Sequence, residues 1–158
     1  MKTVAQILKS KSADTVYQVR PTDSVLDALT LMAEARIGAV LVSEDDGKIV
    51  GIFTERDYAR KVALMGRTSV NTPIRDVMTS AVRYVSPEQT NEDCMSLMTE
   101  HRIRHLPVMK DGELIGLLSI GDLVKAIITE QQFTIDQLEN YIMGGGAALT
   151  GRTSSRPS

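Results

Sequence analysis

The sequence predicts an α+β fold made of two copies of one strand-helix-strand-strand-helix unit. The main observation is an internal repeat, in which Val16 to Val42 aligns without gaps on Val82 to Val108. After one deletion in a turn, "DGKIVGIFTERDY" from Asp46 aligns on "DGELIGLLSIGDL" from Asp111. The spacing of apolar residues also follows the same order in both copies. The chain is therefore an internal duplication over most of its length.

Each copy opens on an alternating segment, at 16–19 and at 82–85, which predicts a short strand. A proline and a hydroxyl residue follow, and apolar side chains then recur at helical spacing, at 25–32 and at 94–98. Two runs rich in Val, Leu and Ile come next, and the Asp-Gly pair between them predicts a β-hairpin. We expect the second helix of each copy to begin at Thr54 or at Ser119.

The predicted boundaries follow from this alignment. The first repeat, with an N-terminal lead segment, spans 1–67, and the second repeat spans 82–133. The polar segment 68–81 is predicted to be a linker with a short helical turn near 74–78. Residues 134–143 extend a helix, and the small, polar composition of 144–158 predicts a flexible tail.

The charge balance argues against nucleic acid as the main partner. Lys plus Arg residues number 18 and Asp plus Glu residues 20, which gives a net charge of -2 without a dense basic run. No apolar stretch reaches the roughly 20 residues that a membrane span requires. Residues 1–11 lack the apolar core of a signal peptide. We therefore expect a cytoplasmic protein that does not enter a membrane.

Neither a catalytic site nor a metal site is expected. Cys94 is the only cysteine, which excludes an internal disulfide and a cysteine-rich zinc site. His101 and His105 lie four residues apart, but the helix should end between them and the chain has no HExxH pattern. Ser119 and Asp122 have no histidine base at a suitable spacing. We expect a protein that is not an enzyme.

The element Gly-x-x-Thr/Ser-x-x-Asp occurs twice, at Gly51 to Asp57 and at Gly116 to Asp122. A hydroxyl residue followed three positions later by an acid is typical of a capping box at a helix start. The same spacing recurs at Ser24 to Asp27 and at Thr90 to Asp93, in polar surroundings. The spacing alone is therefore explained by helix capping and does not indicate a ligand.

Two further details favour a ligand at the repeated element. Glycine inside a strand-like run marks a close backbone approach, and Gly51 and Gly116 stand at equivalent places. The N-terminus of the helix that follows favours a bound phosphate. An ionised aspartate one turn into that helix accepts two hydrogen bonds from a vicinal diol such as ribose. Thr54 and Asp57 would then cap the helix and bind a nucleotide.

These features resemble a tandem pair of CBS domains (cystathionine beta-synthase type), also called a Bateman module. The resemblance covers about 1–130 and rests on the duplicated unit, on "RPTDSVLDAL", and on the closing "GIFTERD" and "GLLSIGD". With "QLENYIMGG" near the C-terminus, the chain is similar to stand-alone bacterial CBS-pair proteins. The resemblance implies two βαββα repeats that pack through their small sheets by pseudo-twofold symmetry. It also implies two clefts for an adenosine-containing ligand.

The resemblance also implies roles for particular residues. Asp57 and Asp122 would hold ribose hydroxyls, and Thr54 and Ser119 would contact phosphate or ribose. The ligand would be AMP or another adenine nucleotide (ADP, ATP or NAD), in preference to S-adenosylmethionine. Homodimers are common in the family, so we expect a homodimer that acts on a regulated protein of unknown identity.

Basic residues are expected to distinguish the two clefts. Arg104 and His105 stand where family members place cations on phosphates, whereas the first copy has Gly38 and Ala39. Arg56 would serve the first cleft. The alternative is that Arg104 and Arg56 are solvated charges and that His105 lies at a sheet edge. Two pockets of unequal affinity are predicted.

The adenine base is expected in an apolar slot. Its candidate residues come from the segment after the linker and from the ends of the first helices: Met78, Thr79, Val82, Ile37 and Ile103. The alternative for the methionine and the isoleucines is ordinary core packing.

Together, the residues and the resemblance favour a non-catalytic sensor of adenosine nucleotides. Two alternatives remain. One is a protein-interaction scaffold with vestigial ligand sites. The other is a nucleic-acid-binding protein, which requires the basic residues after Asp57 to form one exposed face.

Overall fold

The computed structural model describes residues 2–11 and 15–145. The first repeat forms a three-stranded sheet in the order β1-β2-β3, in which β1 is parallel and β3 antiparallel to β2. Its elements are β1 (Gln18–Val19), α2 (Val25–Ala35), β2 (Ala39–Ser43), β3 (Ile49–Thr54), α3 (Glu55–Asp57) and the π-helical continuation η1 (Tyr58–Ala63). This is the predicted order of elements.

The second repeat has the same order but a shorter first strand. Its elements are α4 (Asn91–His101), β4 (His105–Lys110), β5 (Glu113–Ser119) and α5 (Ile120–Gly145). Of the strand predicted at 82–85, only Val85 pairs with β4, in parallel with Val108. The Val82 N–H donates to the Ser80 carbonyl at 3.0 Å, so the chain is still turning where the strand was expected to begin.

Both predicted hairpins form at the Asp-Gly pairs. Gly47 and Gly112 have φ angles of 87° and 79°, a left-handed conformation that glycine adopts without steric cost. The register shifts once in each hairpin, after Val42 in the first copy and after Val108 in the second. The irregularity recurs at equivalent residues, so the duplication extends to the details of the sheets.

The side chains of β2 point alternately to two different cores. Val40 and Val42 pack with α2 and η1 in the core of the first repeat. Ala39 and Leu41 lie on the other face of the sheet, in a cluster that also contains Leu117 of β5. The two repeats therefore pack through their small sheets, which confirms the predicted fold class.

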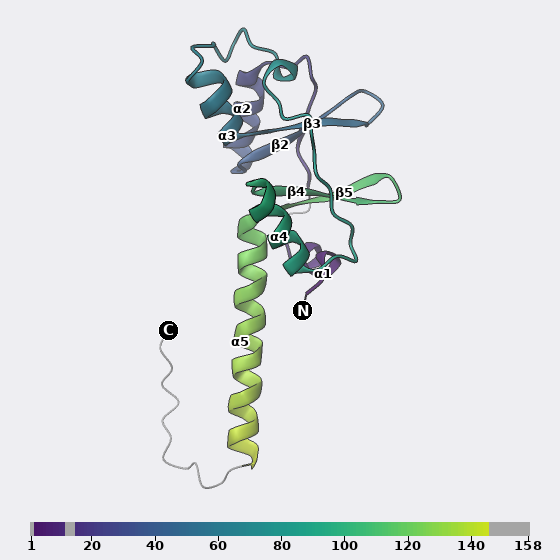
Figure 1. Cartoon of the computed structure of the whole chain (residues 1–158), viewed down its shortest axis with the longest axis vertical. Coiled ribbons are helices and arrows are strands. Elements are labelled where there is room, and N and C mark those ends of the chain that lie inside the picture. The colour runs from purple at the N-terminus through teal and green to yellow at the C-terminus, as the bar shows by residue number, and fades with distance from the viewer. Residues whose placement is uncertain (1, 12–14, 146–158) are drawn as a thin grey trace.

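The segments that precede each repeat cross over to the other one. Helix α1 (Val4–Ser10) precedes the first repeat, yet Val4 and Ile7 are buried in the core of the second repeat. The 3₁₀ turn η2 (Ile74–Asp76) precedes the second repeat, yet Ile74 is buried in the core of the first. Figure 1 shows α1 below β4 and β5, far from α2 and β2 of the first repeat. The two repeats are therefore joined by exchanged segments as well as through their sheets.

Helix α5 runs without interruption from Ile120 to Gly145 and projects far beyond the body of the protein (Figure 1). Residues 134–143 belong to this helix. The tail predicted at 144–158 begins with two residues that are still helical, and the remainder lies outside the described residues. In the described part of the chain, no helix is long and apolar enough to cross a membrane.

Candidate functional site

A cleft of about 930 Å³ lies between the two repeats. Its wall is formed by the end of β3 with α3 and η1, by the chain from Thr79 to Arg83, and by the segment from His101 to Pro107. Most of the predicted site residues line it: Gly38, Thr54, Arg56, Asp57, Thr79, Val82, Ile103, Arg104 and His105. The predicted residues outside this lining are Ile37, Met78, Ser119 and Asp122.

Thr54 and Asp57 form a capping box at the start of α3. The Thr54 N–H donates to Asp57 Oδ2 at 3.1 Å, and the Asp57 N–H donates to Thr54 Oγ1 at 3.1 Å. The same box is present at Ser24 to Asp27 and at Thr90 to Asp93. Helix capping is therefore one role of the motif, as its spacing predicted.

Asp57 differs from the aspartates of those two other boxes because it is buried. Only 7% of its surface is exposed, whereas Asp27 and Asp93 lie in solvent. Its second oxygen, Oδ1, accepts a hydrogen bond from Thr79 Oγ1 at 2.9 Å and lies 3.1 Å from the Lys61 ammonium. A buried carboxylate requires such partners. Asp57 thus holds a negative charge inside the cleft, in addition to its capping role.

Close packing within the protein itself explains the two strand glycines, Gly51 and Gly116. A Cβ atom at Gly51 would lie 2.6 Å from Met78 Sδ and 3.0 Å from the Thr79 carbonyl oxygen. At Gly116, a Cβ atom would lie 2.7 Å from Leu8 Cδ2. The close approach predicted from these glycines therefore exists, but the crossing segments make it. The glycines do not themselves indicate a ligand.

Cations outnumber acids around the cleft. The acidic side chains are Glu55 and Asp57, and the cationic ones are Arg56, Arg60, Lys61, Arg83, Arg102 and Arg104. The Arg56 Nη1 donates to the carbonyl of Arg102 at 2.7 Å, which joins α3 of the first repeat to the end of α4 in the second. Arg104 is exposed at the rim. The cleft is suited to an anionic ligand that contacts both repeats.

His105 is a neutral group in this cleft. Burial lowers its pKa from 6.5, and the Lys11 and Arg104 charges lower it further, while the Asp122 carboxylate opposes them. At neutral pH the imidazole is therefore a hydrogen-bonding group, whereas the sequence suggested a cation on phosphate. A Cβ atom at Gly38 would lie 3.7 Å from His105 Cε1 and 2.7 Å from Glu55 Oε1. Gly38 keeps this part of the cleft open.

The second aspartate has a different environment. The Ser119 N–H donates to Asp122 Oδ2 at 2.8 Å and the Asp122 N–H donates to Ser119 Oγ at 3.2 Å, so this motif also caps its helix. Lys11, which follows α1, places its ammonium 2.9 Å from Asp122 Oδ2 and 2.7 Å from the Leu117 carbonyl. The lead segment thereby supplies a cation to the second carboxylate, as Lys61 does to Asp57.

Two of the predicted groupings differ in the structure. The sequence grouped Arg104 and His105 with Asp122, because all three belong to the second copy. Both residues line the cleft of Asp57, because the repeats face each other, although His105 still senses the charge of Asp122. Ile37 and Met78 pack against the core of the first repeat, as the core-packing alternative predicted.

Sequence reasoning left several cleft residues out of the predicted site. Lys61 is the most important, and its i,i+4 spacing from Asp57 was the signal that could have identified it. Arg83 and Arg102 had no comparable signal, because only the tertiary fold brings them to the cleft. Among residues 2–11 and 15–145, no group of three or more His, Cys, Asp and Glu side chains is placed to hold a metal ion.

Comparisons with known proteins agree on one family. The CBS domain family model matches residues 5–64 and 74–129. CBS domain-containing protein CBSX3, mitochondrial, from Arabidopsis thaliana is 41% identical over 150 residues, which cover 90% of this chain and 73% of that protein. CBS domain-containing protein YhcV from Bacillus subtilis is 31% identical over 143 residues, which cover 90% and 92% of the two chains.

A solved structure shares the same fold at high identity. It is a putative signal-transduction protein with CBS domains from Burkholderia ambifaria MC40-6, and it is 60% identical with a TM-score of 0.79. The match covers 85% of this chain and 99% of that one.

Proposed function

Because the chain belongs to the CBS domain family and carries the tandem pair typical of regulatory modules, we propose that it is a non-catalytic sensor that binds an adenine nucleotide between its repeats. The observation that carries the proposal is the buried Asp57 carboxylate in a cleft that six cationic side chains also line. The carboxylate would accept hydrogen bonds from the ribose hydroxyls, and the arginines and Lys61 would bind the phosphates.

The charge of the cleft restricts the ligand. AMP, ADP, ATP and NAD all carry phosphate, which the basic residues would neutralise. S-adenosylmethionine carries a positive sulfonium and no phosphate, so the same residues would repel it. We therefore expect affinity to follow the negative charge of the ligand, with adenosine and S-adenosylmethionine the weakest.

Regulation would arise because the ligand touches both repeats. Asp57 belongs to the first repeat and Arg104 to the second, and Arg56 already bonds to the Arg102 carbonyl across the boundary. A nucleotide held by both repeats would stabilise one relative orientation, and a partner protein would respond to it.

Thermal unfolding with and without ligand tests the proposal. A ligand at 100 times its Kd stabilises the native state by about 2.7 kcal/mol, so AMP, ATP or NAD should raise Tm clearly. Asp57→Asn should abolish this rise. Asp27→Asn is the matched control, because Asp27 occupies the same capping position on α2 but is exposed. If Asp57→Asn retains the full ligand shift, the assignment of the site is wrong.

The contact between Lys11 and Asp122 favours the scaffold alternative, with a vestigial ligand site, at the second site only. Asp122 is paired with Lys11 and lies outside the lining of the cleft, so the second site is a candidate for a vestigial one. A scaffold without any ligand predicts no thermal shift with AMP, ADP, ATP, NAD or S-adenosylmethionine. The nucleic-acid alternative needs an exposed basic face after Asp57, whereas Arg60 and Lys61, which follow Asp57, line the cleft.

A further inference from the structure

One face of α5, from Val124 to Ile142, presents an apolar stripe that only Gln131 interrupts. The stripe consists of five aliphatic residues: Val124, Ile128, Ile135, Leu138 and Ile142. Between 37% and 60% of the surface of each is exposed. With Gln131 included, successive positions are separated by four and three residues in alternation. This is the a/d spacing of a coiled-coil seam. The helix has 26 residues and is therefore about 39 Å long. It carries a seam along most of that length.

The stripe is not the face that holds α5 to the body. Leu123 and Ala126 are buried in the core of the second repeat. Ile128 lies about 140° around the helix from Leu123, at 100° per residue, and so lies on a different face. Figure 1 shows the lower part of α5 extending away from every labelled element. Among the described residues, no second helix covers the seam.

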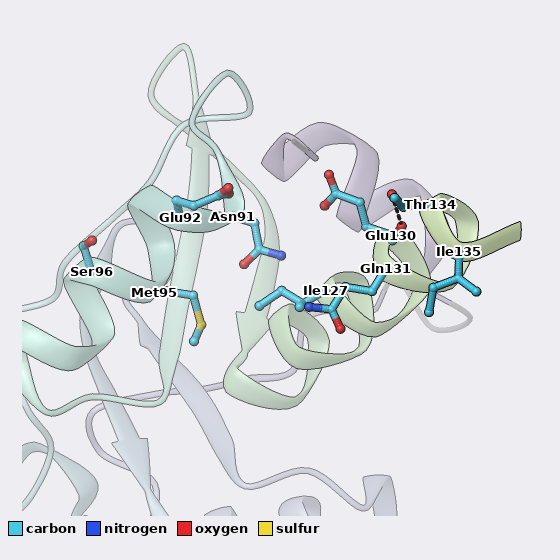
Figure 2. A pocket seen from close by; sticks show the side chains of 9 residues that line it. All are labelled: Asn91, Glu92, Met95, Ser96, Ile127, Glu130, Gln131, Thr134 and Ile135. Atoms are coloured by element: carbon cyan, nitrogen blue, oxygen red, sulfur yellow. Dashed lines mark hydrogen bonds between the residues drawn. The ribbon is translucent and has the colours of Figure 1, made fainter. Parts of the chain in front are cut away.

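A groove continues the seam on the side facing α4. It has a volume of about 780 Å³ and lies between the two helices (Figure 2). Met95 of α4 lies on one side, and Ile127, Thr134 and Ile135 of α5 lie on the other. A helix lying along the seam would therefore also contact α4 over part of its length.

We propose that this seam binds the α5 helix of a second copy of the chain, in antiparallel orientation. In an antiparallel coiled coil each a residue faces a d residue of the partner. When Ile128 faces the partner's Leu138, Val124 faces the partner's Ile142. Ile135 then faces the partner's Gln131. Every seam residue has a counterpart, and the projecting end of each helix lies against the other molecule.

Charge complementarity selects this occupant and this orientation. The antiparallel register places Lys125 beside the partner's Glu139, and the twofold axis repeats the pair. It also places Ile127 of the groove beside the partner's Tyr141. A parallel pair would instead place Thr134 beside the partner's Glu139, which joins no opposite charges. The sequence of α5 is thus complementary to itself when reversed.

A charge exchange measured on the full chain tests the register. Sedimentation equilibrium should show a dimer for the wild-type protein. Lys125→Glu and Glu139→Lys each place like charges together twice per dimer, and each should raise the dimer Kd by about tenfold. The double variant K125E/E139K restores opposite charges and should restore the dimer. Failure of the double variant to recover would overturn the antiparallel register.

A second pair of variants tests the seam. Leu138→Asp should give a monomer with unchanged helicity, because Leu138 is exposed and does not support the body. Phe133→Asp is the control, because Phe133 is 63% exposed but lies on the opposite side of α5. A wild-type monomer at tens of micromolar, a dimer that survives Leu138→Asp, or equal dissociation by Phe133→Asp would each refute the proposal. The inference does not depend on nucleotide binding.

Discussion

The Lys61 ammonium lies 3.1 Å from Asp57 Oδ1, so the carboxylate proposed to hold a ribose already carries a cation. The other oxygen, Oδ2, accepts the hydrogen bond from the Thr54 N–H. A ribose that binds Asp57 must therefore compete with Lys61. The lysine side chain is 43% exposed, and its hydrogen bonds to the Met78 carbonyl and Thr79 Oγ1 are long, at 3.5 and 3.4 Å, so it can turn toward a phosphate when a nucleotide enters.

We predict that Lys61→Met lowers the affinity for ATP relative to the affinity for adenosine. The affinity for ATP should fall about tenfold, because a charge-assisted contact to phosphate is lost. Adenosine should bind unchanged or more tightly, because Oδ1 of Asp57 becomes available to the ribose. Calorimetric titration of both ligands measures the ratio. Lys48→Met in the exposed β2–β3 turn is the control for loss of one positive charge, and equal losses for both ligands would contradict the prediction.

A second prediction concerns the packing of the linker on β3. Gly51→Ala should lower the free energy of unfolding by about 1–3 kcal/mol, because its Cβ would lie 3.0 Å from the Thr79 carbonyl oxygen, which is backbone. Gly121→Ala is the matched control. Its Cβ would meet only Ser119 Oγ, at 3.6 Å, and alanine is the better helix former. Urea unfolding of both variants provides the comparison, and equal stabilities would be inconsistent with this account.

The local signals in the sequence were sufficient for the repeats, the hairpins and the helix caps. The Asp-Gly turns and the Ser24 and Thr90 boxes depend on residues within a few positions of each other, so their structure follows from short-range chemistry. The first strand of the second copy is the exception. Its alternation at 82–85 resembles that of the first copy, but the turn at Ser80 leaves only Val85 in the ladder.

The composition of the cleft depended on long-range packing that the sequence does not display. The spacing of Val4 and Ile7 indicates an apolar helix face, but nothing nearby shows that it enters the core of the second repeat. That exchange delivers Lys11 to Asp122, a residue more than a hundred positions away. For the same reason, Arg104 was grouped with the aspartate of its own copy and lies instead in the cleft of Asp57.

We also predict that Cys94 is unreactive in the folded protein. It is fully buried, and this burial, with a smaller contribution from the Asp93 carboxylate, raises the pKa of the thiol to about 11. The thiolate is the reactive form, and little of it exists at pH 8. Native protein should therefore resist iodoacetamide at pH 8 and react fully in denaturant, as mass spectrometry would show. Rapid modification of the native chain would show that the α4 core opens readily.

The last prediction concerns the stability of the protein at acid pH. The pKa of His105 is lowered below 6.5 in the folded protein by burial, with Lys11 and Arg104 adding to the effect and Asp122 opposing it. Between that lowered value and about 6.5, the unfolded chain binds a proton that the folded protein does not. The free energy of unfolding must therefore fall as the pH falls through this window.

His105→Gln removes this proton and keeps a polar side chain. The variant should lose less stability than the wild-type protein between pH 7 and pH 5, as followed by urea unfolding at each pH. His101→Gln, which removes the other histidine, is the control for replacing an imidazole by an amide. If the free energy of unfolding changes equally with pH in the wild type and in His105→Gln, the imidazole is as easily protonated in the cleft as in the unfolded chain. The cleft would then be better hydrated than the burial of His105 implies, and His105 would be available as a cation for phosphate.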